Sequence, residues 1–503
     1  MTRRAAIAFV LTLAGALMLA GGCEVGPNYR APVSQTPSAF GEGEPTTHPA
    51  AADASVPDPT QPPWVDWWKK FGDAELDSLV DRAVSANYDL QVAAARVQEA
   101  RADKRIADSM LYPTVDISAG FAKAEGSAAG FAFPYGLPGV DRNLYQIGFD
   151  ASYEVDLFGG VRRSIEAAGA LADASEDDRR AVQVTLLGEV ARDYIGLRAL
   201  QLRLAVAQAN LNDQQKTLDI VRRRFNNGLT SNFDLVRASA QVAVTESTIP
   251  PLQAGAQQTI HEISVLLGES PGALSAELSA AASIPPVPPT IPIGLPSELL
   301  RRRPDILRAE RLLAAFTAAQ GVATADLFPH LSLGGTAGVQ SQHTYQLFNQ
   351  HAPSSGFYLG GPSATWTIFD GGKRLATVDR SKAQVAEALA AYKAAVLAAL
   401  RDVDNSLVAY SHDQTQRDTL VTLVAENKEA VRIAQNEYAN GLITLLDVLE
   451  VQRNLYLAQD GLAQADQAVS SDMVALYKAL GGGWETTVST TQPSANAVTT
   501  GAF

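Results

Sequence analysis

Apolar residues recur at every seventh position through one long segment of the chain. Between Gly160 and Phe225 these positions hold Val190, Leu197, Leu204, Leu211, Leu218 and Phe225. A second series beside them holds Leu200, Ala207 and Val221. Sustained heptads predict coiled-coil packing, and about 65 residues at 1.5 Å each predict a helix roughly 100 Å long. A bundle of several shorter helices is the alternative.

A second segment carries the same heptad pattern, which points to an internal repeat. Its heptad positions hold Val403, Tyr410, Val424, Val431 and Tyr438, and Arg417 interrupts them once. Four motifs also recur in one order, at offsets of 216, 212, 213 and 213 residues. Leu111-Tyr112-Pro113 recurs as Leu327-Phe328-Pro329, and Gly159-Gly160-Val161-Arg162 recurs as Gly371-Gly372-Lys373-Arg374. Asn227-Gly228-Leu229, followed by Asp234, recurs as Asn440-Gly441-Leu442, followed by Asp447. Leu267-Gly268 recurs as Leu480-Gly481. A structural duplication with a long period explains this order.

Each half is expected to contain two alternating strands followed by two long helices with a glycine turn between them. The first half spans 64–283, with strands at about 111–123 and 145–157 and helices at about 160–267. The second half spans 297–484, with strands at about 327–339 and 357–369 and helices at about 372–480. A proline-rich linker at 284–296 separates the halves. An extended segment at 23–63 precedes them, and a Thr/Ser-rich tail at 485–503 is expected to be disordered.

The strand expected at 145–157 alternates apolar and polar or small residues without a break, from Tyr145 to Leu157. This pattern suits a membrane strand with apolar side chains facing lipid, and a soluble two-sided sheet is the alternative. Two hairpins give only four strands, whereas membrane barrels need about eight and cannot expose an open edge to lipid. Several copies must therefore share one barrel. A dimer gives eight strands and a trimer twelve, and the arithmetic does not choose between them.

The N-terminus has the pattern of a secretory signal. Arg3 and Arg4 precede an apolar run from Ala5 to Ala20, and the small residues Gly21 and Gly22 lead to the only cysteine, Cys23. We expect residues 1–22 to be a signal peptide and Cys23 to carry lipid, as in bacterial lipoproteins. Acyl chains anchor a protein to a membrane without a spanning helix. A chance cysteine after an ordinary signal is the alternative.

Several functional classes are disfavoured. The net charge of −14 argues against a nucleic-acid partner. One cysteine cannot build a disulfide framework, and the six histidines show no metal-ligand spacing, so no metal or cofactor is expected. The run Gly268-Glu269-Ser270-Pro271-Gly272 matches a hydrolase nucleophile motif, but Pro271 lacks the N–H that an oxyanion hole needs. The chain is therefore not expected to be an enzyme.

Three groups of motifs resemble those of a known family. They are Cys23-Glu24-Val25-Gly26-Pro27-Asn28-Tyr29, then Trp67-Trp68 with Phe71-Gly72-Asp73, then Arg303-Pro304-Asp305-Ile306 with Ala309-Glu310 leading to Phe328-Pro329. The chain resembles outer-membrane efflux lipoproteins of the OprM/NodT type, which are TolC-like, over roughly residues 23–484. The resemblance implies an α+β membrane protein. Three copies would share a 12-stranded outer-membrane β-barrel, continued by a long periplasmic α-helical barrel.

This resemblance implies a passive exit duct in the outer membrane of a Gram-negative bacterium, lipid-anchored and with a long periplasmic part. The expected partners are two further copies, outer-membrane lipid, a periplasmic adaptor and an inner-membrane pump of the RND class. The expected cargo is small molecules such as drugs. A duct for type I protein secretion and a periplasmic coiled-coil scaffold without a pore are the alternatives.

The glycine turns at Gly228 and Gly441 are expected to be the periplasmic tips. Asp447 and Glu450 follow the second turn at an i,i+3 spacing, which puts both carboxylates on one helix face. The resemblance implies that three such pairs ring the closed entrance, where crowding of like charges would raise some pKa values. The alternative is that acidic residues simply favour the first turns of a helix.

The resemblance also implies that Asp234 and Tyr438 are gate contacts, with the tyrosine hydroxyl bonded to the carboxylate. Tyr438 lies on the heptad seam, so simple packing is its alternative role. The arginine found in TolC two residues after the turn glycine is Ile443 here, so that salt bridge cannot form. The run Arg301-Arg302-Arg303-Pro304-Asp305 is interpreted as a structural helix start.

Overall fold

The computed structural model describes residues 23–33, 37, 40, 56–58, 65–125, 141–288, 290–347 and 355–485. The expected signal peptide lies outside these residues, as does the expected tail apart from Glu485. The chain divides into two compact units. We call Met1–Pro32, Gln98–Ala174 and Ala309–Ala391 the sheet unit, and Val33–Val97, Ser175–Arg308 and Tyr392–Phe503 the coil unit.

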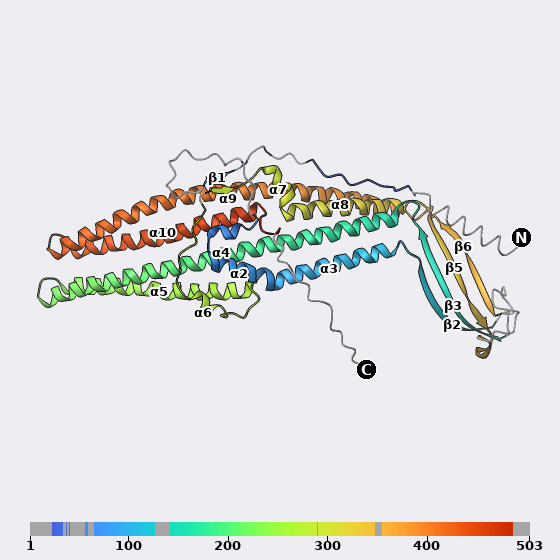
Figure 1. The fold of residues 1–503 in the computed structure, drawn as a ribbon, viewed down its shortest axis with the longest axis horizontal. Coiled ribbons are helices and arrows are strands. Elements are labelled where there is room, and N and C mark those ends of the chain that lie inside the picture. Colours follow the sequence, from blue (N-terminus) through green and yellow to red (C-terminus); the bar gives the residue numbers. More distant parts are fainter. Residues whose placement is uncertain are drawn as a thin grey trace. The chain divides into compact units, whose positions relative to one another are not determined.

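The sheet unit contains one antiparallel sheet in the order β2-β3-β5-β6 (Figure 1). The strands are β2 (Thr114–Glu125), β3 (Asp141–Val155), β5 (His330–Ser341) and β6 (Gly356–Thr365). They are joined to helices of the same unit by turns that contain Pro113 and Pro329. The second half of the chain pairs with the first where β3 lies beside β5.

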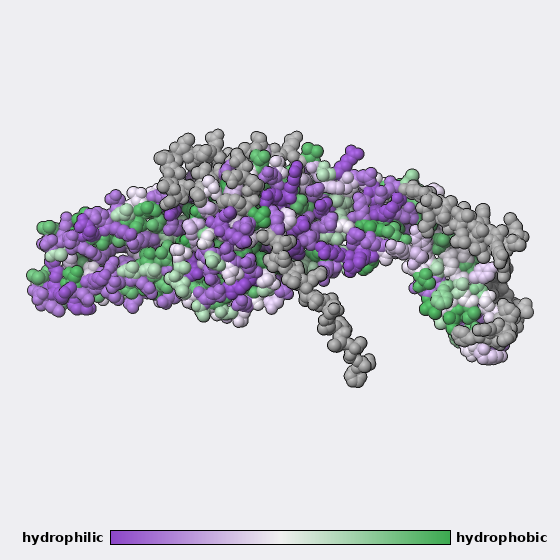
Figure 2. Space-filling view, viewed as in Figure 1, coloured by the Kyte–Doolittle hydropathy of each residue, from purple (hydrophilic) through white to green (hydrophobic). Residues whose placement is uncertain are grey.

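The observed register gathers the alternating apolar residues on one face of the sheet. Ile117 pairs with Phe149, Phe149 with Ala337, and Ala337 with Tyr358. Ile117, Phe149 and Tyr358 are 58–77% exposed, and Figure 2 shows hydrophobic residues gathered over these strands. The opposite face carries polar contacts, such as the Ser118 hydroxyl donating to the Asp150 carboxylate at 2.7 Å.

Strand β6 ends earlier than the alternation predicts. It ends at Thr365 rather than near residue 369, so Trp366 and Ile368 follow the strand instead of belonging to it. The indole N–H of Trp366 donates to the carbonyl of Leu327 at 3.1 Å, outside the β5–β6 ladder. This side-chain bond gives a physical reason for the strand to stop there.

The long helices are α4 (Gly160–Asn226), α5 (Asn232–Leu266), α9 (Lys373–Ala439) and α10 (Leu445–Ala479). α4 and α9 have 67 residues each, or about 100 Å at 1.5 Å per residue, so the alternative of several shorter helices is wrong. α4 turns back into α5 and α9 into α10 (Figure 1). We call these the first and second helix pairs.

Several heptad positions are buried in the coil packing. Val190, Leu197 and Val403 are fully buried. Arg417, which interrupts the second seam, pairs with Asp466 of α10 at 2.6 Å. The burial predicted for the heptad positions is not found at Phe225, which is 36% exposed. α4 ends one residue later, at Asn226, so Phe225 lies in the last turn of the helix, where the heptad series ends.

Shorter elements complete the coil unit. They are β1 (Val56–Asp58), η1 (Trp67–Phe71), α2 (Ala74–Ala86), α6 (Ser275–Leu278), β4 (Thr290–Pro292) and α7 (Pro296–Arg302). Trp67 stacks on Tyr477 at 5.5 Å, while the Asp73 carboxylate caps α2 and accepts the Tyr194 hydroxyl at 2.9 Å. The expected linker is partly ordered as a strand, because β4 pairs in parallel with β1.

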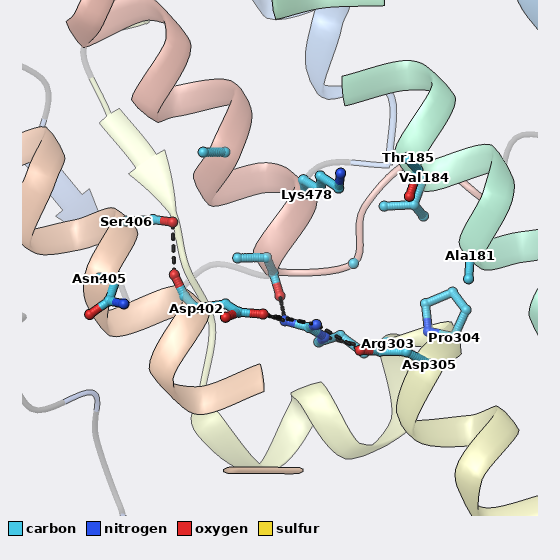
Figure 3. A pocket seen from close by; sticks show the side chains of 13 residues that line it. Ala181, Val184, Thr185, Arg303, Pro304, Asp305, Asp402, Asn405, Ser406 and Lys478 are labelled. Carbon is cyan, nitrogen blue, oxygen red and sulfur yellow. Dashed lines mark hydrogen bonds and ion pairs between the residues drawn. The ribbon is translucent and has the colours of Figure 1, made fainter. Parts of the chain in front are cut away.

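The expected helix start at Pro304 is the first residue of α8 (Pro304–Ala325), and Arg303 just before it joins three helices (Figure 3). Its guanidinium donates to Asp305 at 2.7 Å, to Asp402 of α9 at 3.3 Å and to the Ala479 carbonyl of α10 at 3.0 Å. Burial alone would lower the pKa of Arg303, but the two carboxylates raise it. These groups line a cavity of about 380 Å³. The contacts agree with a structural role.

Candidate functional site

The two helix pairs of the coil unit end in turns of the same design. Gly228 and Gly441 have φ angles of 72° and 78°, in the left-handed region that favours glycine. The amide of Leu229 donates to the carbonyl of Arg224 at 2.8 Å, and Leu442 donates to Glu437 at 2.9 Å. Both turns therefore close their helix by a Schellman-type hydrogen bond. We call residues 227–231 and 440–444 the tip turns.

Asp234 and Asp447 have the same local role in the two pairs. Each occupies the N3 position of a capping box, with Ser231 and Thr444 as the N-cap residues. The Asp447 carboxylate accepts from the Thr444 hydroxyl at 2.7 Å and from its amide at 2.9 Å. These bonds lower the pKa of Asp447 below its usual range. The rise expected from crowding concerns the carboxylates of three copies around one aperture, and it stays a prediction.

Glu450 lies one turn further along α10, and both it and Asp447 are exposed. Within the described part of the chain, Glu450 has no hydrogen bond or ion pair, whereas Asp447 is held by the cap. The i,i+3 spacing places the two carboxylates on one side of the helix. One of the pair is thus fixed in position and the other is available to solvent.

The structure does not join Asp234 to Tyr438 by a hydrogen bond. The Asp234 carboxylate accepts from the hydroxyls of Thr230 and Ser231 at 2.7 and 2.9 Å, and the Thr230 bond is the main cause of its lowered pKa. The Tyr438 hydroxyl is buried, and burial is the main cause of its raised pKa. The expected hydroxyl–carboxylate contact is therefore not formed within the single chain, and the role of Asp234 and Tyr438 as gate contacts stays a prediction.

Tyr438 instead contacts Arg224, which the motifs did not single out. The guanidinium carbon of Arg224 lies 4.7 Å from the centroid of the tyrosine ring. The same guanidinium donates to the backbone carbonyl of Tyr438 at 2.8 Å. One signal for Arg224 was present in the sequence, since it is a basic residue in the last turn of a helix. Its partner on α9 could not be read from that signal.

A hydrophobic cluster joins all four helices just behind the tip turns. Its buried members come from α4, α5, α9 and α10: Val221, Ala238, Ala434, Tyr438, Leu445, Val448 and Leu449. Ile443 packs against this cluster, together with Leu218, Leu235 and Val451. An apolar side chain at position 443 thus adds to packing where an arginine would need a charged partner. We call these residues the tip cluster.

Cys23 is exposed and free, and the residues after it are held in the sheet unit by Arg163. That side chain is only 3% exposed and makes ion pairs with Glu24 at 3.5 Å and Glu166 at 2.6 Å. It also donates to the side-chain oxygen of Asn28. Glu24 and Asn28 both belong to the first motif after the cysteine, so Arg163 fixes that motif one residue from the lipidation candidate.

Two glycines allow this segment to approach α8. Gly26 has a φ of 91°, and a Cβ there would lie 2.6 Å from the Cα of Gly321. A Cβ at Gly321 would in turn lie 2.8 Å from the Arg163 side chain. Tyr29 completes the contact by donating to Glu310 at 3.0 Å. The backbone crossing therefore needs glycine on both sides.

We predict that Arg163→Met releases the segment 23–33 while leaving the fold in place. Methionine keeps the apolar stem but leaves Glu24 and Asn28 without their cationic partner. Limited proteolysis should cut the variant within 23–33 at least tenfold faster than the wild type. Arg162→Met is the matched control, because Arg162 pairs with Asp156 of its own segment at 3.1 Å. Equal cutting of the two variants would contradict the assignment to Arg163.

Within the described residues, no group of three or more His, Cys, Asp or Glu side chains is arranged to hold a metal ion.

In the same part of the chain, one helix, α9, is long and apolar enough by length and composition to cross a membrane. Its most apolar 18-residue window is 22% buried. Most residues of this window are therefore not buried within the single chain.

Comparison with known proteins gives consistent matches. The family model described as outer membrane efflux protein matches residues 79–269 and again 295–482. Nodulation protein T of Rhizobium leguminosarum bv. trifolii is 31% identical over 476 residues, covering 93% of this chain and 96% of that protein. The pyoverdine export outer membrane protein OpmQ of Pseudomonas putida is 35% identical over 426 residues, covering 83% and 88%.

Solved structures agree with these sequence matches. The outer-membrane channel OprN superposes with a TM-score of 0.83 at 35% identity, covering 92% of this chain and all of that one. The open state of the MtrE outer membrane channel of Neisseria gonorrhoeae gives a TM-score of 0.76 at 28% identity, covering 92% and 99%. Both the sheet unit and the coil unit thus have counterparts in known outer-membrane channels.

Proposed function

This chain belongs to the outer membrane efflux protein family, and from that premise we propose that three copies of it form one passive exit duct. It is the outer-membrane channel of a tripartite efflux pump in a Gram-negative bacterium. Its family consists of channel proteins rather than enzymes. The energy for transport therefore comes from the inner-membrane pump, for which we propose the RND class, acting through a periplasmic adaptor.

The observation that supports assembly from several copies is the open sheet of the sheet unit, and we take the number three from the family resemblance. Its order β2-β3-β5-β6 leaves β2 and β6 as edges within the described residues, next to an exposed apolar face. Lipid cannot satisfy the backbone groups of an open edge. Pairing β6 of one copy with β2 of the next closes the sheet, and three copies give a 12-stranded barrel. The exposed apolar window of α9 supports contact between copies in the helical part.

The two halves support an origin by duplication. The same family model matches both, and each contains two strands followed by one 67-residue and one 35-residue helix. Six helix pairs in a trimer can then surround one axis with nearly equivalent contacts. A passive tunnel built in this way needs no catalytic side chain.

We propose small molecules as the cargo, with the pump making the selection. Related proteins are named for the export of pyoverdine and the efflux of toluene, so one channel type serves unlike compounds. No observation on this chain favours a secreted protein as cargo. A scaffold without a pore would leave the apolar sheet face without a role.

At the periplasmic end, Asp447 and Glu450 of three copies would place six carboxylates around one aperture. A ring of this kind favours cations and concentrates negative potential in a narrow throat. In the sheet unit, lipid on Cys23 would anchor the trimer, with Arg163 holding the attachment segment in place.

Native mass spectrometry of protein extracted from the outer membrane in detergent tests the assembly. We expect three chains, each lacking residues 1–22 and carrying the added mass of a lipidated cysteine. Cys23→Ser should lose the lipid mass and keep the trimer, because the sheet closes the barrel without it. A single chain recovered from the soluble periplasm would contradict the duct and favour the scaffold.

A further inference from the structure

The seam between α9 and α10 carries polar side chains where the seam between α4 and α5 is apolar. The helices of the second pair begin and end 213 residues after those of the first, so their positions can be compared directly. Three positions of α4 hold leucine, and their counterparts in α9 are a tyrosine, an aspartate and an arginine: Leu197 and Tyr410, Leu200 and Asp413, Leu204 and Arg417. Packing of a helix pair therefore does not require polar side chains at these positions.

Arg417 and Asp466 set the register of α9 on α10, because they form an ion pair at 2.6 Å. Antiparallel helices then bring Asp413, one turn before Arg417, near Asp472 of α10. Both aspartates are half-buried, and their carboxyl groups are hydrogen-bonded to each other. We call Asp413 and Asp472 the acid pair.

A hydrogen bond between two carboxyl groups requires a proton. Among the described residues, no N–H or hydroxyl group donates to the buried Oδ2 of Asp472. An ionised carboxylate can only accept, so one member of the acid pair carries a proton and donates it to the other. Burial, and after it the bond to Asp413, raises the pKa of Asp472 to about 7.

The neighbouring groups on α9 and α10 do not take the place of this proton. Arg417, one turn from Asp413, is paired with Asp466. Tyr410 and Tyr477 lie about one turn further along the same seam in the other direction, and burial raises the pKa of Tyr477. Tyrosine hydroxyls are neutral near pH 7, so neither ring adds a charge there.

Two further elements lie against this part of the seam. α4 runs beside α10, where a Cβ at Gly188 would lie 3.3 Å from the Lys478 side chain. Lys478 is exposed, and the charged residues of α4 along this stretch interact with one another: Glu189, Arg192 and Asp193. The linker residues 283–287 line a cavity on the same seam and carry no charge. Among the described residues, no cation forms an ion pair with the acid pair.

We propose that the acid pair is a proton-sensitive contact: Asp413 and Asp472 share one proton, and its loss as the pH rises loosens α10 from α9. Two ionised carboxylates in a half-buried seam repel each other when no cation pairs with them. The inference goes beyond the duct, because it concerns helix packing within one chain and holds whether or not the trimer conducts.

The direction of the pH dependence follows from the two states of Asp472. An aspartate in the unfolded chain loses its proton near pH 4, whereas Asp472 in the folded chain loses it near pH 7. The stability that this proton contributes is therefore complete below about pH 4 and is lost as the pH rises to about 7.

Hydrogen exchange of the purified protein in detergent tests the contact at two pH values. Asp472→Asn keeps the shape of the side chain and offers Asp413 an amide donor at any pH. At pH 8, backbone amides in 410–416 and 469–475 should exchange about threefold or more faster in the wild type than in Asp472→Asn. At pH 5.5 the two proteins should exchange alike, because wild-type Asp472 then carries its proton.

Two further variants control for charge and for packing. Glu426→Gln removes one exposed carboxylate from α9 and should exchange as the wild type does at both pH values. Asp413→Leu with Asp472→Thr copies Leu200 and Thr259 of the first helix pair, so it should fold and exchange as slowly as Asp472→Asn at pH 8. If the wild type and Asp472→Asn differ equally at both pH values, or at neither, the proposal is overturned.

Infrared difference spectroscopy detects the proton itself. The wild type should lose one protonated-carboxyl band as the pH rises, with a midpoint near 7, and Asp472→Asn should lack that band. The same band in Asp472→Asn, or its absence from the wild type, would overturn the shared proton. Neither result would bear on the duct, because neither measurement depends on conduction.

Discussion

Arg303→Met should lower the free energy of unfolding by about 3 kcal/mol, because it removes the common partner of two carboxylates and a helix-end carbonyl. Asp305 and Asp402 would keep their charges at the junction of α8 with α9, and the Ala479 carbonyl at the end of α10 would lose its donor. Arg303 itself is only 11% exposed, so water cannot readily replace it.

The measurement is the melting temperature of the purified trimer, followed by circular dichroism. A loss of this size corresponds to a fall of about 3 °C, since the unfolding entropy is about 2.1 cal/mol/K per residue. Arg301→Met is the matched control, since Arg301 is exposed and has no hydrogen bond or ion pair among the described residues. Equal melting temperatures for the two variants would show that the junction does not depend on Arg303.

The second large effect concerns ion selectivity. Asp447→Asn with Glu450→Gln removes two charges per chain and six per trimer from the proposed entrance. We expect the permeability ratio of cations to anions to fall severalfold towards one. The trimer should persist, because asparagine can still accept a hydrogen bond within the cap at Thr444.

A control pair makes the same charge change away from the tips. Glu246→Gln with Glu426→Gln removes two exposed carboxylates about 20 Å along the helices from the tip turns, beyond the Debye length of about 10 Å at 0.1 M salt. This pair should leave the permeability ratio unchanged. The same loss of selectivity in both double variants would assign the effect to net charge rather than to a ring.

The pKa direction of Asp447 adds a pH dependence to this prediction. Hydrogen bonds from Thr444 lower the pKa of Asp447, so its carboxylate stays charged as the pH falls through the ordinary aspartate range. The cation preference should therefore persist in mildly acidic solution. A preference already lost at pH 5 would mean that Asp447 does not set it.

Periodic patterns were the part of the molecule that the sequence predicted well. Alternation at 145–157 correctly predicted which residues share a sheet face, because successive side chains of a strand point to opposite faces. The observed strand pairs place these residues side by side on that face. Heptads anticipated α4 and α9 for a similar reason. The tip turns could be located because a left-handed backbone position selects glycine.

Contacts between distant segments were beyond the sequence. Arg163 meets Glu24 and Asn28 across more than 130 residues, and Arg224 meets Tyr438 across 214. Neither pairing follows a helical or strand period, so no local pattern encodes it. The bond expected from Tyr438 to Asp234 is not formed within one chain, where the hydroxyls of Thr230 and Ser231 donate to that carboxylate, and its role as a gate contact stays a prediction.

The most direct test of the central claim is the conductance of the wild-type trimer in a planar bilayer under a salt gradient. The proposed duct predicts discrete current steps whose reversal potential is biased towards cations, as six carboxylates at one aperture require. Protein of verified trimeric mass that gives no steps would contradict the duct. A reversal potential biased towards anions would contradict the carboxylate ring at its entrance.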